Sequence, residues 1–178
     1  MNPISQLIES LNAGNLWDDT IMLNRNDFLT ESGATDTNLY YVVEGSFRVY
    51  VIEEHEEHTI RFGYKNNLNA ALDSFLNETP TELYIQAIKQ STVKTLNKNK
   101  FMDFIASSSE NTKLWQLMLE QFVLQQMERE RDILIQSPIE RYNRVLRRSP
   151  QLFQEVPNKY IASYLRMTPE TFSRIKKS

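Results

Sequence analysis

The most informative stretch of this sequence is residues 158–177, which read NKYIASYLRMTPETFSRIKK. Thr168 followed by Pro169 is typical of a helix start, because threonine caps the first amides and proline suits the first helical position. Ala162 is small enough for a second helix to cross the first closely. The apolar residues of the pair are Ile161, Leu165, Met167, Phe172 and Ile175. This spacing predicts a helix-turn-helix, and the alternative is an ordinary helical hairpin with a basic face.

The second of these helices carries side chains that suit the major groove of DNA. Arg174 can pair bidentately with guanine, and Glu170 can accept a hydrogen bond from cytosine. The neighbouring hydroxyl and ammonium groups can hold phosphates. The predicted DNA-binding residues are Lys159, Thr168, Glu170, Thr171, Ser173, Arg174, Lys176 and Lys177.

The charge of the chain is divided between its two ends. Residues 141–178 hold nine Lys or Arg and two acids, a net charge of +7, whereas the whole chain carries −3. Residues 1–140 therefore carry a net charge of −10. Because phosphates favour clustered cations, a basic end on an acidic body favours binding to a nucleic acid. A solvated basic helix face is the alternative that charge alone leaves open.

Before the basic end, residues 110–136 form the longest helical pattern and contain no Gly or Pro. Its apolar residues cover more than one stripe, so we expect it to pack on two sides. A second copy of the chain is the preferred partner, and burial within a monomer is the alternative. Ser137-Pro138 with Glu140 predicts a capping box that begins another helix. We interpret this junction as a hinge.

Residues 20–99 have a different character and predict short strands. The β-rich runs are residues 40–44, 46–52, 59–64, 83–88 and 92–96, with a short helix within 66–76. Short strands with intervening turns indicate a sandwich or barrel. An amphipathic helix is expected at residues 3–13, and further helical material at 101–106.

The composition of the 178 residues excludes several classes of protein. With 40% hydrophobic and 24% charged residues, disorder is ruled out as the main state. The absence of cysteine excludes disulfides, iron–sulfur clusters and thiol catalysis. No secretory signal and no membrane span is predicted, so we expect a cytoplasmic location. No Ser/His/Asp constellation, P-loop or dinucleotide motif occurs, so we expect no enzyme.

The hexapeptide EEHEEH, residues 53–58, has the composition of a metal site. It lies between two predicted strands, where a charged hairpin tip is polar because it is solvated. Ligands on a hairpin tip rarely enclose an ion without a further ligand from elsewhere. We therefore predict no metal site and no cofactor.

Nearly the whole chain resembles the Crp/Fnr family of bacterial transcription regulators. The segment FLTESGATDTNLYYVVEGSFRVYV (28–51) looks like the family's early β-roll, with Gly33 and Gly45 in its turns. The segment VPNKYIASYLRMTPETFSRIKK (156–177) looks like its helix-turn-helix, with Glu170 and Arg174 at the base-reading positions. The resemblance implies an α+β chain of three parts. These are a cyclic-nucleotide-binding-like β-roll at 1–109, a dimerisation helix at 110–136 and a DNA-binding domain at 137–178.

The resemblance also implies partners: double-stranded DNA, a second copy of the chain, RNA polymerase and a small-molecule effector of unknown identity. The competing interpretation is a non-enzymatic ligand-binding or protein-interaction module whose basic tail does not read DNA sequence.

The family's cyclic-AMP binders carry a Gly-Glu pair and an Arg-Ser or Arg-Thr pair in a phosphate-binding cassette. This chain has Ala70-Ala71 and Thr81-Glu82 at those places, and no arginine between Arg61 and Arg129. A cyclic phosphate needs a cation or free amides, so we expect no cyclic-AMP binding in the usual mode. The candidate effector-pocket residues are Ala70, Ala71, Thr81, Glu82, Gln125 and Gln126.

Two differences from the family concern the DNA-binding end. Arg166 stands where the family's turn usually holds glycine, which predicts a left-handed backbone there at a cost of about 1 kcal/mol and a cation near the DNA. Pro169 stands where some relatives read a base with arginine, so the recognised sequence should differ. We expect no wing hairpin after the second helix.

Overall fold

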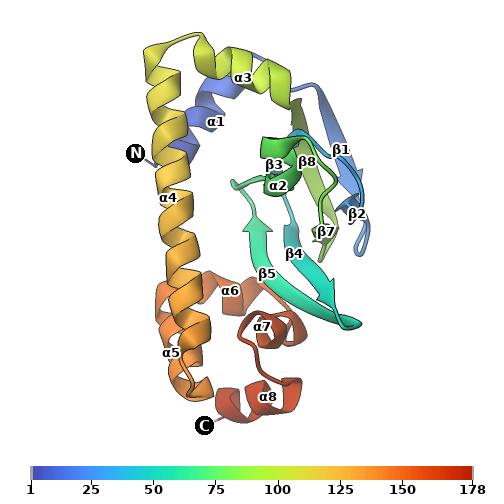
Figure 1. The fold of residues 1–178 in the computed structure, drawn as a ribbon, viewed down its shortest axis with the longest axis vertical. Helices are drawn as coiled ribbons and strands as arrows, with labels where there is room; N and C mark the ends of the chain where they lie inside the picture. Colours follow the sequence, from blue (N-terminus) through green and yellow to red (C-terminus); the bar gives the residue numbers. More distant parts are fainter. Residues whose placement is uncertain (1, 178) are drawn as a thin grey trace. The chain divides into compact units, whose positions relative to one another are not determined.

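The computed structural model describes residues 2–177 (Figure 1). The chain divides into two compact units. The first unit comprises the chain up to Val49 together with Phe62–Phe122. The second comprises Tyr50–Arg61 together with the chain from Val123 onward. The tip of one β-hairpin therefore groups with the C-terminal helices rather than with the rest of the β-structure.

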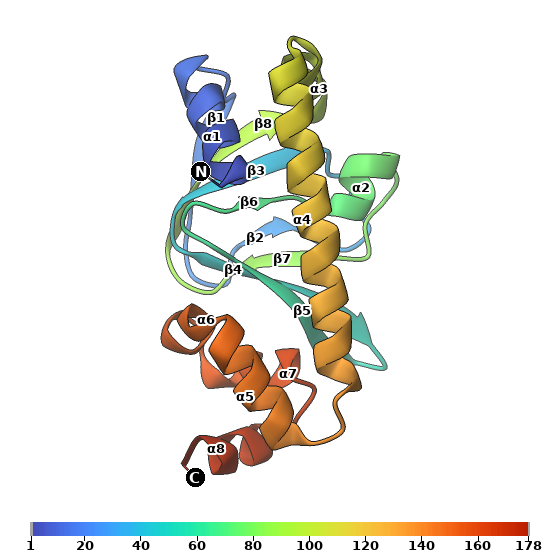
Figure 2. The same ribbon diagram turned by 90° about the vertical axis from the view of Figure 1, so that its left-hand side faces the viewer.

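The β-structure consists of two four-stranded sheets (Figure 2). In order across the first sheet lie β1 (Asp19–Leu23), β8 (Ser91–Asn97), β3 (Asn38–Glu44) and β6 (Leu68–Asn69). In order across the second lie β2 (Phe28–Thr30), β7 (Tyr84–Ala87), β4 (Ser46–Glu53) and β5 (Glu56–Tyr64). The α+β class with an antiparallel β-roll, expected from the sequence, is confirmed.

The central pair β3 and β8 shows why these residues form strands. The two strands are antiparallel, and Leu39 lies opposite Leu96 while Val42 lies opposite Val93. All four side chains are buried. Because side chains alternate along a strand, the Leu39–Leu96 pair and the Val42–Val93 pair lie on opposite faces, so both faces of β3 and β8 are covered. The sequence did not predict β1, β2 and β6, because β1 is exposed at four of its five residues and the other two are very short.

The turn between β3 and β4 requires glycine. Gly45 has φ +103°, and a Cβ there would lie 2.0 Å from Oγ of Ser91. No larger residue can occupy this position without moving β8, which explains one of the two turn glycines that the sequence singles out.

Helices cover the core of the first unit. They are α1 (Pro3–Ala13), α2 (Leu72–Asn77), α3 (Lys98–Ala106) and the first half of α4 (Ser109–Leu134). Their buried residues and two from the sheet form one cluster: Leu7, Leu11, Leu39, Phe75, Leu96, Phe101, Ile105 and Leu114. The predicted helices at 3–13 and 101–106 are confirmed.

The second unit contains the end of α4 and four short helices, α5 (Pro138–Arg148), α6 (Pro150–Glu155), α7 (Asn158–Tyr164) and α8 (Pro169–Lys177). Helix α4 ends at Leu134, two residues before the sequence predicts. Ser137 has an extended backbone and its side chain accepts a hydrogen bond from the amide of Glu140, so it caps α5 instead of continuing α4.

No helix in residues 2–177 is long and apolar enough to cross a membrane.

Candidate nucleic-acid interface

The outer face of α8 presents a row of polar and charged side chains. Glu170, Ser173, Arg174 and Lys177 are spaced i, i+3, i+4 and i+7, so they share one face of the helix, and all four are exposed. Phe172 points the opposite way and is fully buried. The helix is therefore anchored on one side and free to contact a ligand on the other.

An aromatic cluster fixes the inner face of α8. The rings of Tyr142 and Phe153 lie 5.7 Å and 6.4 Å from the ring of Phe172, centroid to centroid. Ile161 and Leu165 from α7 and the turn after it are fully buried in the same unit. These contacts hold α5, α6 and α8 together, so the exposed row on α8 belongs to a packed body.

The remaining predicted DNA-binding residues have other contacts. The hydroxyl of Thr168 accepts a hydrogen bond from the amide of Thr171 at 3.2 Å, as the predicted helix cap requires. Lys176 donates to the side chain of Asn158 at 3.1 Å and joins α8 to α7. Lys159 lies 4.6 Å from the ring centroid of Tyr160. Thr168, Lys159 and Lys176 are all exposed, so these contacts leave the two ammonium groups accessible.

Arg166 forms the turn between α7 and α8 and has φ +53°, the left-handed backbone that the sequence predicts. Two partners hold it. Arg141 donates from Nη2 to the carbonyl oxygen of Arg166 at 3.1 Å, and Nη1 of Arg166 lies 3.0 Å from Nδ1 of His58. These contacts offset the strain of about 1 kcal/mol that a non-glycine residue brings here.

The β4–β5 hairpin reaches α7 through its backbone. The hydroxyl of Ser163 accepts a hydrogen bond from the amide of Thr59 at 3.0 Å and donates to the carbonyl oxygen of Glu57 at 3.0 Å. One side chain of α7 thus satisfies two backbone groups of the hairpin.

Arg129 of α4 contacts both α7 and the β4–β5 hairpin. Its guanidinium carbon is 4.0 Å from the ring centroid of Tyr164, and its Nη2 is 3.5 Å from the carbonyl oxygen of Thr59. Only 9% of the residue is exposed, and burial lowers the pKa of this guanidinium. Arg129 therefore joins α4, α7 and the hairpin in one contact.

Ion pairs bridge the junction between α4 and α5. The carboxylate of Asp132, fully buried, pairs with Nε of Arg144 at 2.8 Å and with Arg148. Glu128 pairs with the same two arginines. Burial lowers the pKa of Arg148, but the carboxylate of Asp132 outweighs burial, so the net shift is upward. The junction that the sequence suggests as a hinge is thus held within one unit.

The candidate effector residues divide between the two units. In the first, Ala70 and Ala71 precede α2, and the buried Thr81 donates its hydroxyl to the carboxylate of Asp73 on α2 at 2.8 Å. The amide of Glu82 donates to the same carboxylate at 3.3 Å. Asp73 therefore already uses the donors of this loop, and its charge together with that of Glu82 disfavours an anion.

In the second unit, Gln125 and Gln126 are both exposed. Gln126 accepts a hydrogen bond from Nη2 of Arg61 on β5 at 2.8 Å.

A shallow groove of about 320 Å³ lies elsewhere in the first unit, along β2, the following turn and β3. None of the candidate effector residues lines it. Its buried carboxylate, Asp36, already accepts from Thr30, Asn38 and Tyr40. The groove is therefore bounded by a satisfied polar network that holds β2 against β3.

At the hexapeptide of residues 53–58, the backbone turns at Glu54 and His55, which both have positive φ. In the part of the chain that the structure describes, no three His, Cys, Asp or Glu side chains gather as a metal site would require.

The two sheets, the long helix and the small C-terminal helices define a fold that is known from Crp/Fnr regulators. FixK2 from Bradyrhizobium japonicum matches with a TM-score of 0.74 and 15% identity, over 89% of this chain and 82% of that one. CLP from Xanthomonas campestris matches with a TM-score of 0.70 and 12% identity, over 97% of this chain and 90% of that one. A mutant of CooA from Carboxydothermus hydrogenoformans matches with a TM-score of 0.69 and 17% identity, over 96% of this chain and 82% of that one.

In sequence, residues 20–108 match the model of the cyclic nucleotide-binding domain. These residues make up half of the chain. The chain belongs to the cyclic nucleotide-binding domain family. No curated protein matches it.

The sequence alone does not predict the residues that hold the α7–α8 pair in place. Ser163, Arg129 and Arg141 act through contacts with residues 25 to 106 positions away. The one local signal was Arg166, since an arginine in a left-handed turn needs compensating contacts.

Proposed function

We propose that this protein is a dimeric DNA-binding transcription regulator of Crp/Fnr type, with α7 and α8 as its helix-turn-helix. The observation that carries the proposal is the exposed row of Glu170, Ser173, Arg174 and Lys177 on a helix whose other face is buried. The net charge of +7 on residues 141–178 supports it.

In the proposed complex, α8 enters the major groove, where Arg174 pairs with guanine and Glu170 with cytosine. Phosphate contacts come from the surrounding residues, namely Lys159, Thr168, Thr171, Ser173, Lys176 and Lys177. Thr168 combines this role with capping α8.

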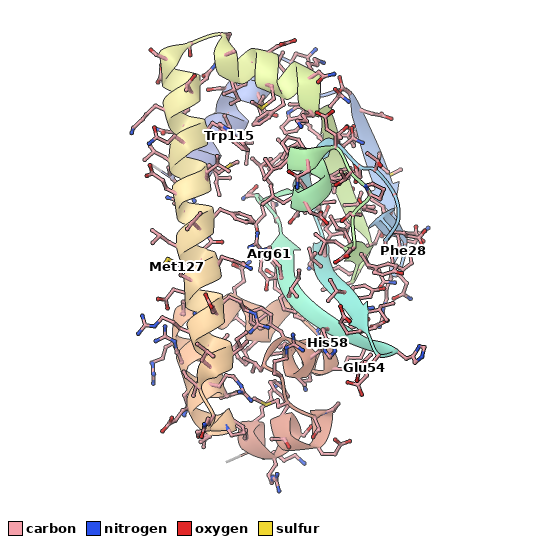
Figure 3. The ribbon with its side chains drawn as sticks, in the orientation of Figure 1. Phe28, Glu54, His58, Arg61, Trp115 and Met127 are labelled. Carbon is pink, nitrogen blue, oxygen red and sulfur yellow. The ribbon has the colours of Figure 1, made fainter. Side chains whose placement is uncertain are left out.

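A second copy of the chain is proposed to cover α4. Four of its apolar side chains are strongly exposed: Val123 at 58%, Leu124 at 61%, Met127 at 55% and Leu134 at 71%. Leu124, Met127 and Leu134 follow a heptad spacing, which suits a two-helix seam. Met127 lies on the side of α4 away from Arg61 (Figure 3). Two protomers would then read two half-sites about one DNA turn apart.

We propose the sensor, dimer-helix and DNA-binding parts at 1–109, 110–136 and 137–178, as the sequence suggests, and a cytoplasmic location. The protein would act on RNA polymerase at promoters and would not be an enzyme. The effector of the β-roll is not cyclic AMP in the usual mode, because Asp73 and Glu82 present carboxylates where a phosphate would lie. CLP is described as c-di-GMP responsive, so a shared fold does not imply a shared effector.

The test is fluorescence anisotropy of the purified protein with a duplex from upstream of its own reading frame and a scrambled duplex, across ~50–200 mM salt. Selective binding that persists at the higher salt is expected. Equal and salt-labile binding to both duplexes would favour the alternative, a ligand-binding or interaction module with a basic tail that does not read sequence.

A further inference from the structure

We propose that Arg61 of β5 and Arg129 of α4 form a binding site for a phosphate group, carried by inorganic phosphate or by a small phosphorylated metabolite. Both residues belong to the second unit. The site shares no residue with the groove along β2 or with the loop that contains Asp73 and Glu82. The inference goes beyond the proposed function, because neither the site nor its test involves DNA.

Arg129 is a buried cation whose hydrogen-bonding capacity is largely unused. Its guanidinium lies over the ring of Tyr164, and Nη2 reaches the carbonyl oxygen of Thr59 only at 3.5 Å. Nη1 is buried and donates to no atom of residues 2–177. In the same part of the chain, no carboxylate forms an ion pair with Arg129. A buried charged donor without an acceptor is costly, so this side chain points to a ligand that accepts from it.

The charges around Arg129 do not neutralise it. Asp132 attracts the guanidinium of Arg129, but its carboxylate already pairs with Arg144 and Arg148. Arg148 and Arg166 both repel it. Burial is the main cause that lowers the pKa of Arg129, although an arginine in a protein stays protonated at neutral pH. The surroundings of this guanidinium therefore carry an excess of positive charge, which an anion would balance.

Arg61 brings a second guanidinium to the same place. Thr59 and Arg61 are two residues apart on β5 and share a face of the strand. Gln126 and Arg129 are three residues apart on α4 and share a face of the helix. These two faces meet, because Nη2 of Arg61 donates to Oε1 of Gln126 at 2.8 Å and Arg129 reaches Thr59 (Figure 3). Burial lowers the pKa of Arg61 as well, so both cations are partly withdrawn from water.

Two converging guanidiniums suit a phosphate better than a carboxylate. A phosphate dianion has oxygens in several directions and can accept from both forks, whereas a carboxylate has one charge and one plane. The side chain of Gln126 is exposed and neutral, and Arg61 is half-buried, so the site is reached from the surface. A phosphate that replaced the Gln126 amide on Arg61 would form a stronger, charge-assisted bond and bring negative charge to Arg129.

The test is thermal unfolding of the full chain in up to ~50 mM inorganic phosphate, compared with chloride at equal ionic strength. Phosphate should raise the unfolding temperature saturably, and an equal temperature in both salts overturns the site. Arg129→Gln should weaken phosphate binding about tenfold or more, whereas Arg131→Gln, which removes the same charge from an exposed position of α4, should change it less than about twofold. Equal losses in the two variants would mean a general charge effect and overturn the site. Arg61→Gln, at a half-buried position, should also lose phosphate binding, and it decides the question if Arg129→Gln does not fold.

Two further arms locate the phosphate and identify its source. Arg174→Ala, on the exposed face of α8, should keep the full phosphate effect, and its loss there would place the ion on α8 and overturn the site. Methyl phosphate, a monoester, is then compared with inorganic phosphate. Equal stabilisation by the ester supports the phosphate group of a metabolite, and stabilisation by inorganic phosphate alone supports the free ion. No arm contains DNA, so failure of the phosphate site leaves the proposed function intact, and failure of selective DNA binding leaves the site intact.

Discussion

At the scale of single residues, Arg166 shows how a sequence anomaly becomes a structural feature. Arginine in a left-handed turn is unfavourable on its own, yet its carbonyl and its guanidinium each have a partner. Arg141 and His58 come from a helix and a hairpin that are far apart in the chain. The turn before α8 is therefore held by tertiary contacts rather than by glycine.

Arg174 is the residue whose loss should most affect sequence selectivity. Arg174→Ala should weaken binding to the preferred duplex by ~1–3 kcal/mol and relax one base position, because a bidentate pair with guanine is lost. Lys177→Ala is the matched control: it should weaken all duplexes similarly and reduce the slope of log affinity against log salt by about one. Anisotropy across salt concentrations measures both. Wild-type selectivity in Arg174→Ala would contradict the placement of α8 in the groove.

Tyr40 should make the first unit sensitive to alkaline pH. Its hydroxyl donates to the carboxylate of Asp36 at 2.9 Å, and burial together with this charge raises the pKa of the phenol. A raised pKa in the folded state stabilises the fold below the unfolded pKa of about 10, and this contribution is lost as pH rises further. Tyr40→Phe should lower stability by about 1 kcal/mol at neutral pH and make the alkaline decline shallower. Urea unfolding at several pH values measures this, and an identical decline would contradict it.

At the scale of elements, α2 and the loop after it form the segment that we propose does not hold a cyclic phosphate. Asp73 on α2 accepts from Thr81 and from the amide of Glu82, so the loop is closed on its own carboxylate. Its donors are thus engaged within the loop itself, next to two carboxylates.

Cyclic AMP should therefore produce no thermal shift at millimolar concentration. A ligand present at ~100 times its dissociation constant would add ~2.7 kcal/mol to the free energy of unfolding, a shift that thermal unfolding detects easily. A clear shift would contradict the assignment of Asp73 and Glu82 as excluding an anion. The same assay with Asp73→Asn tests whether this carboxylate alone excludes it.

Helix α4 should hold two protomers together through its exposed apolar face. Leu124→Glu places a charge in the proposed seam and should convert the dimer to monomers, since a carboxylate cannot be buried there without a partner. Lys113→Glu, at an exposed position earlier in the same helix, should leave the dimer intact. Sedimentation velocity distinguishes the two species. A dimer that persists in Leu124→Glu would place the interface elsewhere.

At the scale of the whole molecule, the boundary between the two compact units does not follow the order of the chain. Residues 50–61 leave the β-structure of the first unit and group with α5 to α8. Helix α4 likewise contributes its first half to one unit and its second half to the other. Each unit thus contains part of α4 and part of the β4–β5 hairpin.

The ion pairs of Asp132 should support the second unit selectively. Asp132→Asn leaves Arg144 and Arg148 without their buried partner and should lower the free energy of unfolding by about 2–3 kcal/mol. This loss is smaller than the ~3–5 kcal/mol for fully buried pairs, because both arginines are partly exposed. Hydrogen exchange should become faster in α5 to α8 and stay unchanged in the core strands β3 and β8. Equal acceleration in both units would mean that they unfold together.

The order of the elements could be predicted from local patterns, because helical and strand periodicity are properties of adjacent residues. Proline and serine at the start of α5 and the Thr168 cap of α8 are signals of the same kind. Short and exposed strands such as β1 were missed, since an edge strand without a buried face has no alternation. The contacts of Asp73 could not be predicted, because Thr81 and Glu82 reach it only when the loop folds back on α2.

By itself, the sequence determined the longer strands, the long helix and the two-helix end with its basic charge, because each depends on residue types at fixed local spacing. It also predicted the absence of cyclic-AMP binding in the usual mode, since no arginine occurs between Arg61 and Arg129. Only the tertiary structure decided what surrounds these parts: His58 beside Arg166, Ser163 against the hairpin, and Arg129 over Tyr164. Such contacts join residues that are distant along the chain, and their partners are selected by packing and by the need to satisfy buried polar groups.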